Sequence, residues 1–222
     1  MAYTYNYPHP AVSVDIVIFT IRDDALSVLL VERGLPPFQG EWALPGGFIR
    51  LDESLKHAAW RELKEETGVN AAYLEQLYTF GHPKRDPRER VISVAYFALL
   101  PSDKLEIRAA SDARNVAWFD TREVPQLAFD HNKILRKAEH RLAAKIEYST
   151  IALQLMPDRF TLPHLQHVYE LIRGGPIDKR NFRKRIRALK VIEPTGEESR
   201  SGARRPAKLY RLTDRNRVDV IK

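Results

Sequence analysis

The sequence predicts an α/β domain followed by a smaller helical domain that ends in a hairpin. In residues 1–147, short apolar segments typical of strands alternate with amphipathic segments typical of helices. In residues 148–222, helical segments come first, and a strand follows a polar, glycine-bounded loop. The charge changes at the same boundary, because residues 148–222 hold 17 Lys and Arg against 8 Asp and Glu, whereas residues 1–147 hold 19 against 21. We therefore predict two domains, 1–147 and 148–222.

The first domain is expected to begin with a pair of strands. Residues 12–20 and 27–32 are rich in Val, Ile and Leu, and the polar residues 22–24 between them predict a turn. Two later apolar segments, residues 91–100 and 115–119, are expected to be further strands.

Two amphipathic helices are expected in the same domain. Residues 53–67 have an apolar face that we expect to turn inward, formed by Leu55, Ala59 and Leu63. Residues 132–147 have an apolar stripe formed by Ile134, Leu135, Ala138, Leu142 and Ile146. The second of these helices is expected to close the first domain and to lead into the second as a linker.

The second domain is expected to contain three helices and a hairpin. A short helix over 150–155 precedes a helix over 161–173, which has a threonine cap and a proline in its first turn. Asp178 caps a third helix, whose apolar face is formed by Phe182, Ile186 and Leu189. A polar loop over 196–206 then leads to a strand at 208–212. This order predicts a winged helix-turn-helix domain.

The most specific motif is the string GFIRLDESLKHAAWRELKEETGV, which begins at Gly47. Its fixed positions follow the spacing G-x5-E-x7-R-E-U-x-E-E-x-G-U, where U is a bulky aliphatic residue, without a gap or a substitution. A helix over this string places three carboxylates on one face, those of Glu62, Glu65 and Glu66. Three close anions repel one another unless a cation neutralises them, and an all-carboxylate set suits Mg2+ or Mn2+. The motif therefore predicts a divalent metal site.

The same motif predicts phosphate chemistry. A metal held there would bridge diphosphate oxygens and activate water, and Gly46 and Gly47 would let the backbone approach the phosphates. Arg61 is placed to orient the outer carboxylates. The candidate general base is Glu65, and Asp112 in a later loop is the alternative. The predicted catalytic residues are Glu53, Arg61, Glu65 and Glu66.

Two alternatives remain for this motif. A solvated helix face with i,i+4 charge pairs would explain the acidic and basic residues of RELKEE. It would not explain the glycine pair, the gap between Glu53 and Glu62, or the closing Thr-Gly-Val. The other alternative is a domain that keeps the motif as a ligand-binding scaffold and hydrolyses slowly or not at all.

The third helix of the second domain is strongly basic on the side opposite its apolar face. A solvated basic face is the alternative, but the turn before this helix and the arginines of the following loop favour nucleic-acid binding. In this interpretation the helix enters the major groove, and the loop reaches phosphates or a minor groove. The predicted DNA-binding residues are Arg180, Asn181, Arg183, Lys184 and Arg187 on the helix, and Arg200, Arg204 and Arg205 in the loop.

Composition restricts the compartment. The chain has no cysteine, which excludes disulfides and thiolate metal sites and fits a cytoplasmic protein. The apolar run 12–19 is too short to span a bilayer and is interrupted by Asp15. The first ten residues lack the basic segment of an export signal. We expect a cytoplasmic location and no membrane partner.

The spacing of the motif at Gly47 is that of the Nudix box. Together with FTLPHLQHVYELIRGGPIDKRNFRKRIRAL and ARRPAKLYRL, the chain resembles the Nudix-related transcriptional regulators of NAD metabolism along essentially its whole length. This resemblance implies an α/β (α+β) Nudix fold, with a mixed sheet sandwiched by helices, followed by a small winged helix-turn-helix domain. It also implies a dimeric bacterial repressor that binds ADP-ribose or a related NAD-derived nucleotide and thereby leaves a palindromic operator in double-stranded DNA.

ADP-ribose would find several partners near the motif. Its diphosphate would lie at Gly46, Gly47 and the Mg2+ or Mn2+ ion. Arginines and a lysine would contact phosphate or ribose, with Arg33 and Arg85 foremost and Lys84 and Arg88 beside them. Phe38 or Trp42 would stack on adenine. The alternative for each aromatic ring is ordinary packing, and for each arginine a solvated loop; taken one by one, most of these residues favour the alternative.

Many members of this group are expected to carry a decayed Nudix box, whereas this sequence keeps every box residue. ADP-ribose pyrophosphatase activity, slow or vestigial in a regulator, is therefore expected. The alternative is a protein that is mainly a Nudix hydrolase, which cleaves nucleoside diphosphate derivatives such as ADP-ribose to AMP and ribose 5-phosphate.

Overall fold

The structure is a computed structural model that describes residues 6–68, 73–101, 103, 113–199, 206–215 and 217–221, without the side chains of residues 66, 67, 113 and 114. The chain forms two compact units. The first unit comprises Met1–Ile18, Val28–Ala98 and Glu106–Ala138, and the second comprises Phe19–Ser27, Leu99–Leu105 and Glu139–Lys222.

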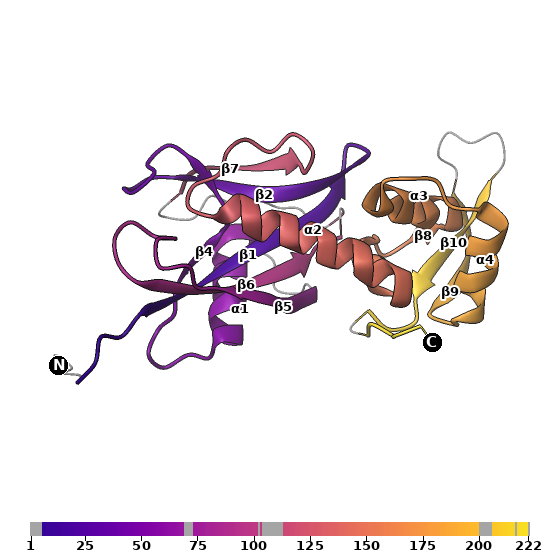
Figure 1. The fold of residues 1–222 in the computed structure, drawn as a ribbon. Coiled ribbons are helices and arrows are strands. Elements are labelled where there is room, and N and C mark those ends of the chain that lie inside the picture. Colours follow the sequence, from indigo (N-terminus) through magenta and orange to yellow (C-terminus); the bar gives the residue numbers. More distant parts are fainter. Residues whose placement is uncertain are drawn as a thin grey trace. The chain divides into compact units, whose positions relative to one another are not determined.

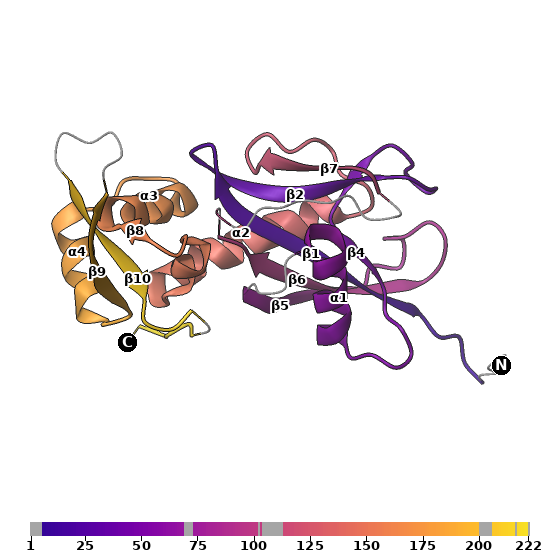
Figure 2. The ribbon, with the colours of Figure 1, turned by 180° about the vertical axis from the view of Figure 1, so that it is seen from behind.

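A seven-stranded sheet forms the amino-terminal part of the chain (Figure 1). The strand order is β3-β2-β1-β6-β5, while β4 pairs with β1 and β7 pairs with β2. Helices α1 (Leu55–Thr67) and α2 (His131–Tyr148) lie on opposite faces of this sheet, as Figures 1 and 2 show from two sides. The strands are β1 (Ala11–Arg22), β2 (Ala25–Arg33), β3 (Trp42–Ala43), β4 (Gly46–Phe48), β5 (Tyr73–Phe80), β6 (Val91–Leu99) and β7 (Ala113–Asp120).

The predicted strand pair at the start of the chain is confirmed. Strand β1 is buried along nearly its whole length, which explains its almost continuous apolar sequence. The turn between β1 and β2 places Asp23 and Asp24 at φ 48° and 63°, a conformation that short Asp residues tolerate in hairpins. The expected strands at 91–100 and 115–119 are present as β6 and β7.

Three strands of the sheet were not predicted. Strands β3 and β4 contain only two and three residues, too few to give a periodic pattern. Strand β5 lies at the sheet edge and buries only Leu77, so its sequence lacks the apolar alternation of a half-buried strand.

Both helices of this part have local causes. Helix α1 begins at Leu55 rather than at the predicted Glu53, because the Ser54 Oγ accepts a hydrogen bond from the His57 amide and caps the helix. Gly68, at φ 70°, ends it. Ala59 and Leu63 are buried as predicted, whereas Leu55 is only partly buried. In α2 all residues of the predicted apolar stripe are buried.

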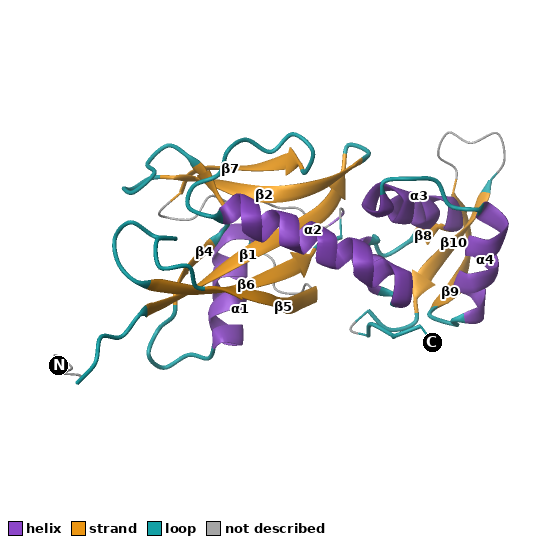
Figure 3. Cartoon of the chain, in the orientation of Figure 1, coloured by secondary structure: helices purple, strands orange, loops and turns teal. Residues whose placement is uncertain are grey.

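The second unit contains the predicted helices and hairpin (Figure 3). Thr161 caps one helix through its side chain, and Gly174 at φ 75° ends it. The side chain of Asp178 caps the next helix by accepting from the Asn181 amide at 2.8 Å. The elements are the 3-10 helix η2 (Ile151–Leu155), β8 (Phe160–Thr161), α3 (Leu162–Arg173), α4 (Lys179–Ala188), β9 (Ile192–Ser199) and β10 (Ala207–Leu212).

Several details of this unit differ from the prediction. The expected loop from residue 196 begins later, because β9 continues through Gly196 to Ser199. The segment 150–155 is a 3-10 helix, and Leu189 follows α4 as its C-cap. Strand β8, too short to be seen in the sequence, pairs with β10 and completes a three-stranded sheet of order β8-β10-β9. In the part of the chain that the structure describes, no helix is both long and apolar enough to cross a membrane.

Candidate functional site

Arg61 on α1 gathers the carboxylates of the Nudix box. Its Nε and Nη2 donate to the two oxygens of Glu53 at 3.1 and 2.7 Å, which is the bidentate geometry of a strong ion pair. Its Nη1 donates to Glu62 Oε1 at 2.6 Å and to Glu65 Oε2 at 3.3 Å. Arg61 therefore contacts three of the four acidic residues that the motif placed in the site.

The pKa values of two of these carboxyl groups are shifted in opposite directions, because Arg61 dominates at Glu53 and burial dominates at Glu62. The hydrogen bonds from Arg61 lower the pKa of Glu53 to about 2, so that this carboxylate stays charged. Burial raises the pKa of Glu62, which is only 8% exposed, and the neighbouring Glu65 raises it further. A cation bound beside Glu62 would therefore stabilise its charged form, which burial disfavours.

The glycine pair before α1 is required by contacts within the chain. A Cβ at Gly47 would lie 2.3 Å from Glu62 Oε1, and a Cβ at Gly46 would lie 2.2 Å from the carbonyl oxygen of Val14. Gly46 pairs with Asp15 and Gly47 with Val14 in the β1–β4 ladder. The two glycines let β4 pass between β1 and the Glu62 carboxylate, which brings the backbone against the acidic cluster.

The donor types of the cluster suit a hard divalent cation, because the available atoms are carboxylate oxygens. Glu65 is half exposed, with 49% of its side chain accessible, and Glu62 lies beside it in the Arg61 contact network. The backbone of Glu66 lies in α1, but its side chain is outside the described part. Among the described residues there is no group of three His, Cys, Asp or Glu side chains that is arranged to hold a metal.

Aromatic rings and guanidinium groups form a second cluster near β4. The guanidinium of Arg33 lies 4.8 Å from the centre of the Phe129 ring, and that of Arg88 lies 5.7 Å from the same ring and 5.4 Å from Phe48. Phe38 meets Phe129 edge to face at 4.8 Å. Phe38 and Phe129 have φ values of 61° and 55°, which are unusual for bulky residues and occur most often at functional sites.

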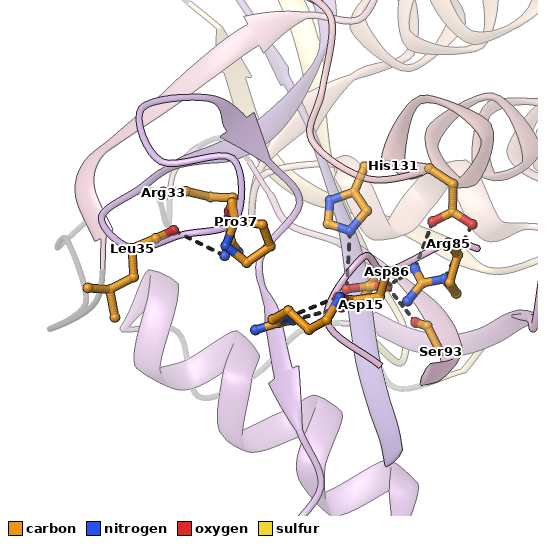
Figure 4. A network of polar contacts seen from close by, with 10 residues as sticks. Asp15, Arg33, Leu35, Pro37, Arg85, Asp86, Ser93 and His131 are labelled. Carbon is orange, nitrogen blue, oxygen red and sulfur yellow. Dashed lines mark hydrogen bonds and ion pairs between the residues drawn. The ribbon is translucent and has the colours of Figure 1, made fainter. Parts of the chain in front are cut away.

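The two guanidinium groups of this cluster differ in their partners. Burial lowers the pKa of Arg33, and the positive charge of Arg88 lowers it further. Arg33 donates to the carbonyl oxygens of Pro37 at 2.8 Å and Leu35 at 3.3 Å (Figure 4). Arg88 forms an ion pair with Asp86 at 2.7 Å. A guanidinium held by carbonyls beside a second cation favours an anionic ligand.

Two predicted ligand residues have other contacts. Trp42 packs edge to face against Phe119 at 4.8 Å. Arg85 is buried, and its Nη2 lies 3.0 Å from Asp15 and 2.8 Å from Asp130. Both Arg85 contacts are within the chain, whereas the sequence led us to expect contacts to phosphate or ribose. The assignments of ligand, catalytic and metal residues stay predictions.

A buried polar network surrounds Asp15 and was not predicted (Figure 4). Ser93 donates to Asp15 Oδ2 at 2.5 Å, Arg85 donates to the same oxygen, and His131 Nε2 lies 3.5 Å from Oδ1. His131 Nδ1 accepts the Leu44 amide at 2.9 Å. Burial lowers the pKa of His131. The one signal in the sequence was the charge of Asp15 in an apolar strand.

The basic helix α4 exposes most of its predicted DNA-binding residues. Arg180, Asn181, Lys184 and Arg187 are exposed, while Phe182 and Ile186 are buried. Arg183 is partly buried, and its Nε has no hydrogen-bond partner among the described residues. Arg185, which was not predicted, donates to the Glu147 carbonyl at 2.8 Å and so caps the last turn of α2. The predictions at Arg200, Arg204 and Arg205 lie outside the described residues.

The fold and the two clusters define a Nudix domain followed by a winged helix domain. The family model of the NUDIX domain matches residues 9–139, and that of the NrtR DNA-binding winged helix domain matches residues 152–212. The chain therefore belongs to the Nudix family, in the group that carries an NrtR winged helix domain. This confirms the predicted fold class.

Three known proteins are similar to the chain. The ADPR responsive transcriptional repressor NtrR of Acinetobacter baylyi is 39% identical over 93% of this chain and 84% of its own length. The ADP-ribose pyrophosphatase of Methanocaldococcus jannaschii is 42% identical over 59% of this chain and 73% of its own length. The crystal structure of Shewanella oneidensis NrtR complexed with a 27mer DNA matches with a TM-score of 0.83 and 40% identity, covering 92% of this chain and 95% of that one.

Proposed function

We propose that the chain is a transcriptional repressor that responds to ADP-ribose. The observation that carries this proposal is the combination of a complete Nudix box with an exposed basic face on α4 in one chain. The similarity to an ADPR responsive repressor over 93% of the chain supports it. The winged domain would bind operator DNA, and the Nudix domain would bind the nucleotide that releases it.

The DNA contacts would be made by the exposed arc of α4. Arg180, Lys184 and Arg187 would contact phosphates or base edges in the major groove, with Asn181 placed to contact an adenine. Arg183 would contribute less, because its Nε is buried. The loop arginines at 200, 204 and 205 would add phosphate contacts. A winged domain that binds a palindromic operator requires two copies, so the functional form would be a homodimer.

ADP-ribose would bind along β4 and the two clusters beside it. The diphosphate would lie against Gly46 and Gly47, and Arg33 would supply positive charge. Phe38 is the better candidate for adenine stacking, since its strained backbone presents it beside Phe129, while Trp42 already packs on Phe119. Arg85 would hold Asp15 in place through their ion pair and would not contact the nucleotide.

Mg2+ or Mn2+ would be held by Glu62, Glu65 and Glu66. When bound, the cation would offset the negative charge that develops on the diphosphate during cleavage. Arg61 would keep Glu53 charged and would hold the carboxylates at the spacing that the cation needs. A bound cation would stabilise the charged form of Glu62, which burial disfavours in the free protein.

A second function, ADP-ribose pyrophosphatase activity, is favoured by the complete box and by the similarity to a pyrophosphatase. Water would attack one phosphorus of the diphosphate, the bond from that phosphorus to the bridging oxygen would break, and the other phosphate would leave, which gives AMP and ribose 5-phosphate. Glu65 is the candidate base, and its exposed carboxylate is accessible to water. Hydrolysis would end the signal that ADP-ribose gives to the DNA-binding domain.

One titration tests both functions. Duplexes selected from a random library by the full chain are labelled, and their binding is followed by fluorescence anisotropy at about 150 mM salt with increasing ADP-ribose and Mg2+. We expect selected duplexes to bind at least about 1,000-fold more tightly than scrambled ones, and ADP-ribose to release them. AMP is measured in the same samples. A chain that enriches no sequence and shows no ADP-ribose effect would refute the repressor, and Glu66→Gln with unchanged AMP release would refute the metal assignment.

A further inference from the structure

The network around Asp15 joins segments that are far apart in the sequence. Asp15 is in β1, Arg85 in the β5–β6 loop, Ser93 in β6 and His131 at the first residue of α2. All four are buried, with exposed fractions of 8% or less. Replacing a buried ion pair by apolar side chains of similar volume is often neutral or stabilising. A polar network at this place therefore calls for a role beyond stability.

His131 has a fixed protonation pattern in this network. Its Nδ1 accepts the Leu44 amide, so that nitrogen carries no proton. The remaining proton is on Nε2, which faces Asp15 Oδ1 at 3.5 Å. His131 thus has the Leu44 amide on one side and the Asp15 carboxylate on the other, and Figure 4 shows the second of these contacts.

The amide that His131 binds belongs to the segment that enters the Nudix box. Leu44 is followed by Pro45, whose carbonyl accepts the Ile16 amide at 2.8 Å, and by the two glycines. The carboxylate of Asp15 reaches within 3.1 Å of the position of a Cβ at Gly46. Residues 44–47 are therefore held by β1 on one side and by His131 on the other, and they end against Glu62.

The first turn of α2 is held by the same network. Asp130, the residue before α2, accepts from Arg85 at 2.8 and 3.3 Å, and its carbonyl accepts the Lys133 amide at 2.9 Å. A displacement of residues 44–47 would change the Leu44–His131 hydrogen bond and hence the position of this turn. The residues of α2 belong to both compact units, which makes it a suitable carrier of a signal.

We propose that His131 is a positioning residue that couples ligand binding at the segment 44–47 to the first turn of α2, through its hydrogen bond from Leu44. This inference rests on the proposed function, because the ligand in question is ADP-ribose and the output is DNA release. His131 would not contact the nucleotide. Its role would be to shift the first turn of α2 when residues 44–47 move.

Three variants of the full chain separate this role from a structural one. His131→Leu removes both polar contacts of the ring. His131→Gln keeps an acceptor for Leu44 and a donor for Asp15. Asn132→Ala is the matched control, because Asn132 also fixes the start of α2, through the Leu127 amide at 2.9 Å and the Pro125 carbonyl at 3.3 Å, and neither of these hydrogen bonds involves residues 44–47.

Hydrogen exchange without ligand gives the first measurement. In His131→Leu, the amides of Leu44, Gly46, Gly47 and Phe48 should exchange at least tenfold faster than in the wild type, while His131→Gln and Asn132→Ala should retain the wild-type rates in this segment. Equal rates in wild type and His131→Leu would overturn the proposal. This arm needs neither ADP-ribose nor DNA, so that it stands apart from the proposed function.

ADP-ribose gives the second measurement. In the wild type, ADP-ribose with Mg2+ should change exchange in the first turn of α2, and saturating ADP-ribose should lower DNA affinity. Both effects should fall at least tenfold in His131→Leu and persist in His131→Gln and Asn132→Ala. If ADP-ribose does not release DNA from the wild type, the proposed repressor function is refuted. The coupling is then tested only by the change in hydrogen exchange in the first turn of α2. An unchanged α2 in the wild type, or full DNA release by His131→Leu, would overturn the coupling.

Discussion

Gly47 is the residue whose replacement tests the geometry of the acidic cluster most directly. In Gly47→Ala, the new Cβ would lie 2.3 Å from Glu62 Oε1 and 3.0 Å from its Cδ, whereas ordinary contact begins at 3.4 Å. The carboxylate would have to move by about 1 Å. It is held in place by Arg61 at 2.6 Å, so the movement would stretch or break that hydrogen bond.

Gly47→Ala should weaken metal and nucleotide binding and lower the stability of a fold that nonetheless persists. Displacing a group that orients a metal ligand typically lowers affinity or activity by roughly 10- to 100-fold, and we expect Gly47→Ala to do so. The atom it strikes is the end of a flexible side chain, so the fold should persist. Losing the charge-assisted hydrogen bond should lower the free energy of unfolding by about 1.5–3 kcal/mol.

The assay is calorimetry of ADP-ribose binding with and without Mg2+, together with AMP release and thermal unfolding. Gly81→Ala is the matched control, since its Cβ would meet nothing nearer than Ile92 Cγ1 at 4.0 Å. Gly81→Ala should keep wild-type affinity. If Gly47→Ala bound ADP-ribose and Mg2+ as tightly as Gly81→Ala, the reasoning that places Glu62 in the ligand site would be wrong.

The remaining predictions address acidity, the buried ion pairs and the DNA-binding face. Burial raises the pKa of Glu62, so Mg2+ competes with a proton at this group up to a higher pH than at an ordinary carboxyl group. Mg2+ affinity should therefore rise as the pH rises through that pKa. Calorimetry in buffers of different ionisation enthalpy measures the proton release. Arg85→Met leaves the buried carboxylate of Asp15 and the partly buried one of Asp130 without their cation and should cost about 3–5 kcal/mol in urea unfolding. Arg122→Ala removes the cation of an exposed pair and should cost far less; equal costs would contradict the burial argument. Arg180→Ala should reduce the salt slope of DNA binding by about 1, and Lys64→Ala on α1 should leave it unchanged.

The parts of the fold that sequence predicts well are those with local causes. The stripe of α2 follows from the helical repeat, and the caps at Thr161 and Asp178 follow from side chains that bond amides three residues away. The Arg61 contact to Glu53 was predictable for the same reason, because the motif fixes a short separation.

Other features depend on residues that are distant in the sequence. The Leu44 amide meets His131, and Arg85 meets Asp15, only because the sheet brings these segments together. Nothing in the neighbourhood of Arg85 indicates that it is buried; its charge and loop position instead suggested a ligand contact. Strand β5 was missed because sheet-edge strands bury too little to show a period.

The contact of Arg185 with the last turn of α2 affects how the protein can be divided for study. Arg185 donates to the carbonyl of Glu147, so the end of α2 holds one side chain of α4 in place. A fragment that starts at Tyr148 would leave this guanidinium without its acceptor. A fragment that starts at Glu139, where the second unit resumes, would keep the acceptor and is the better choice for measuring the intrinsic affinity of the winged domain.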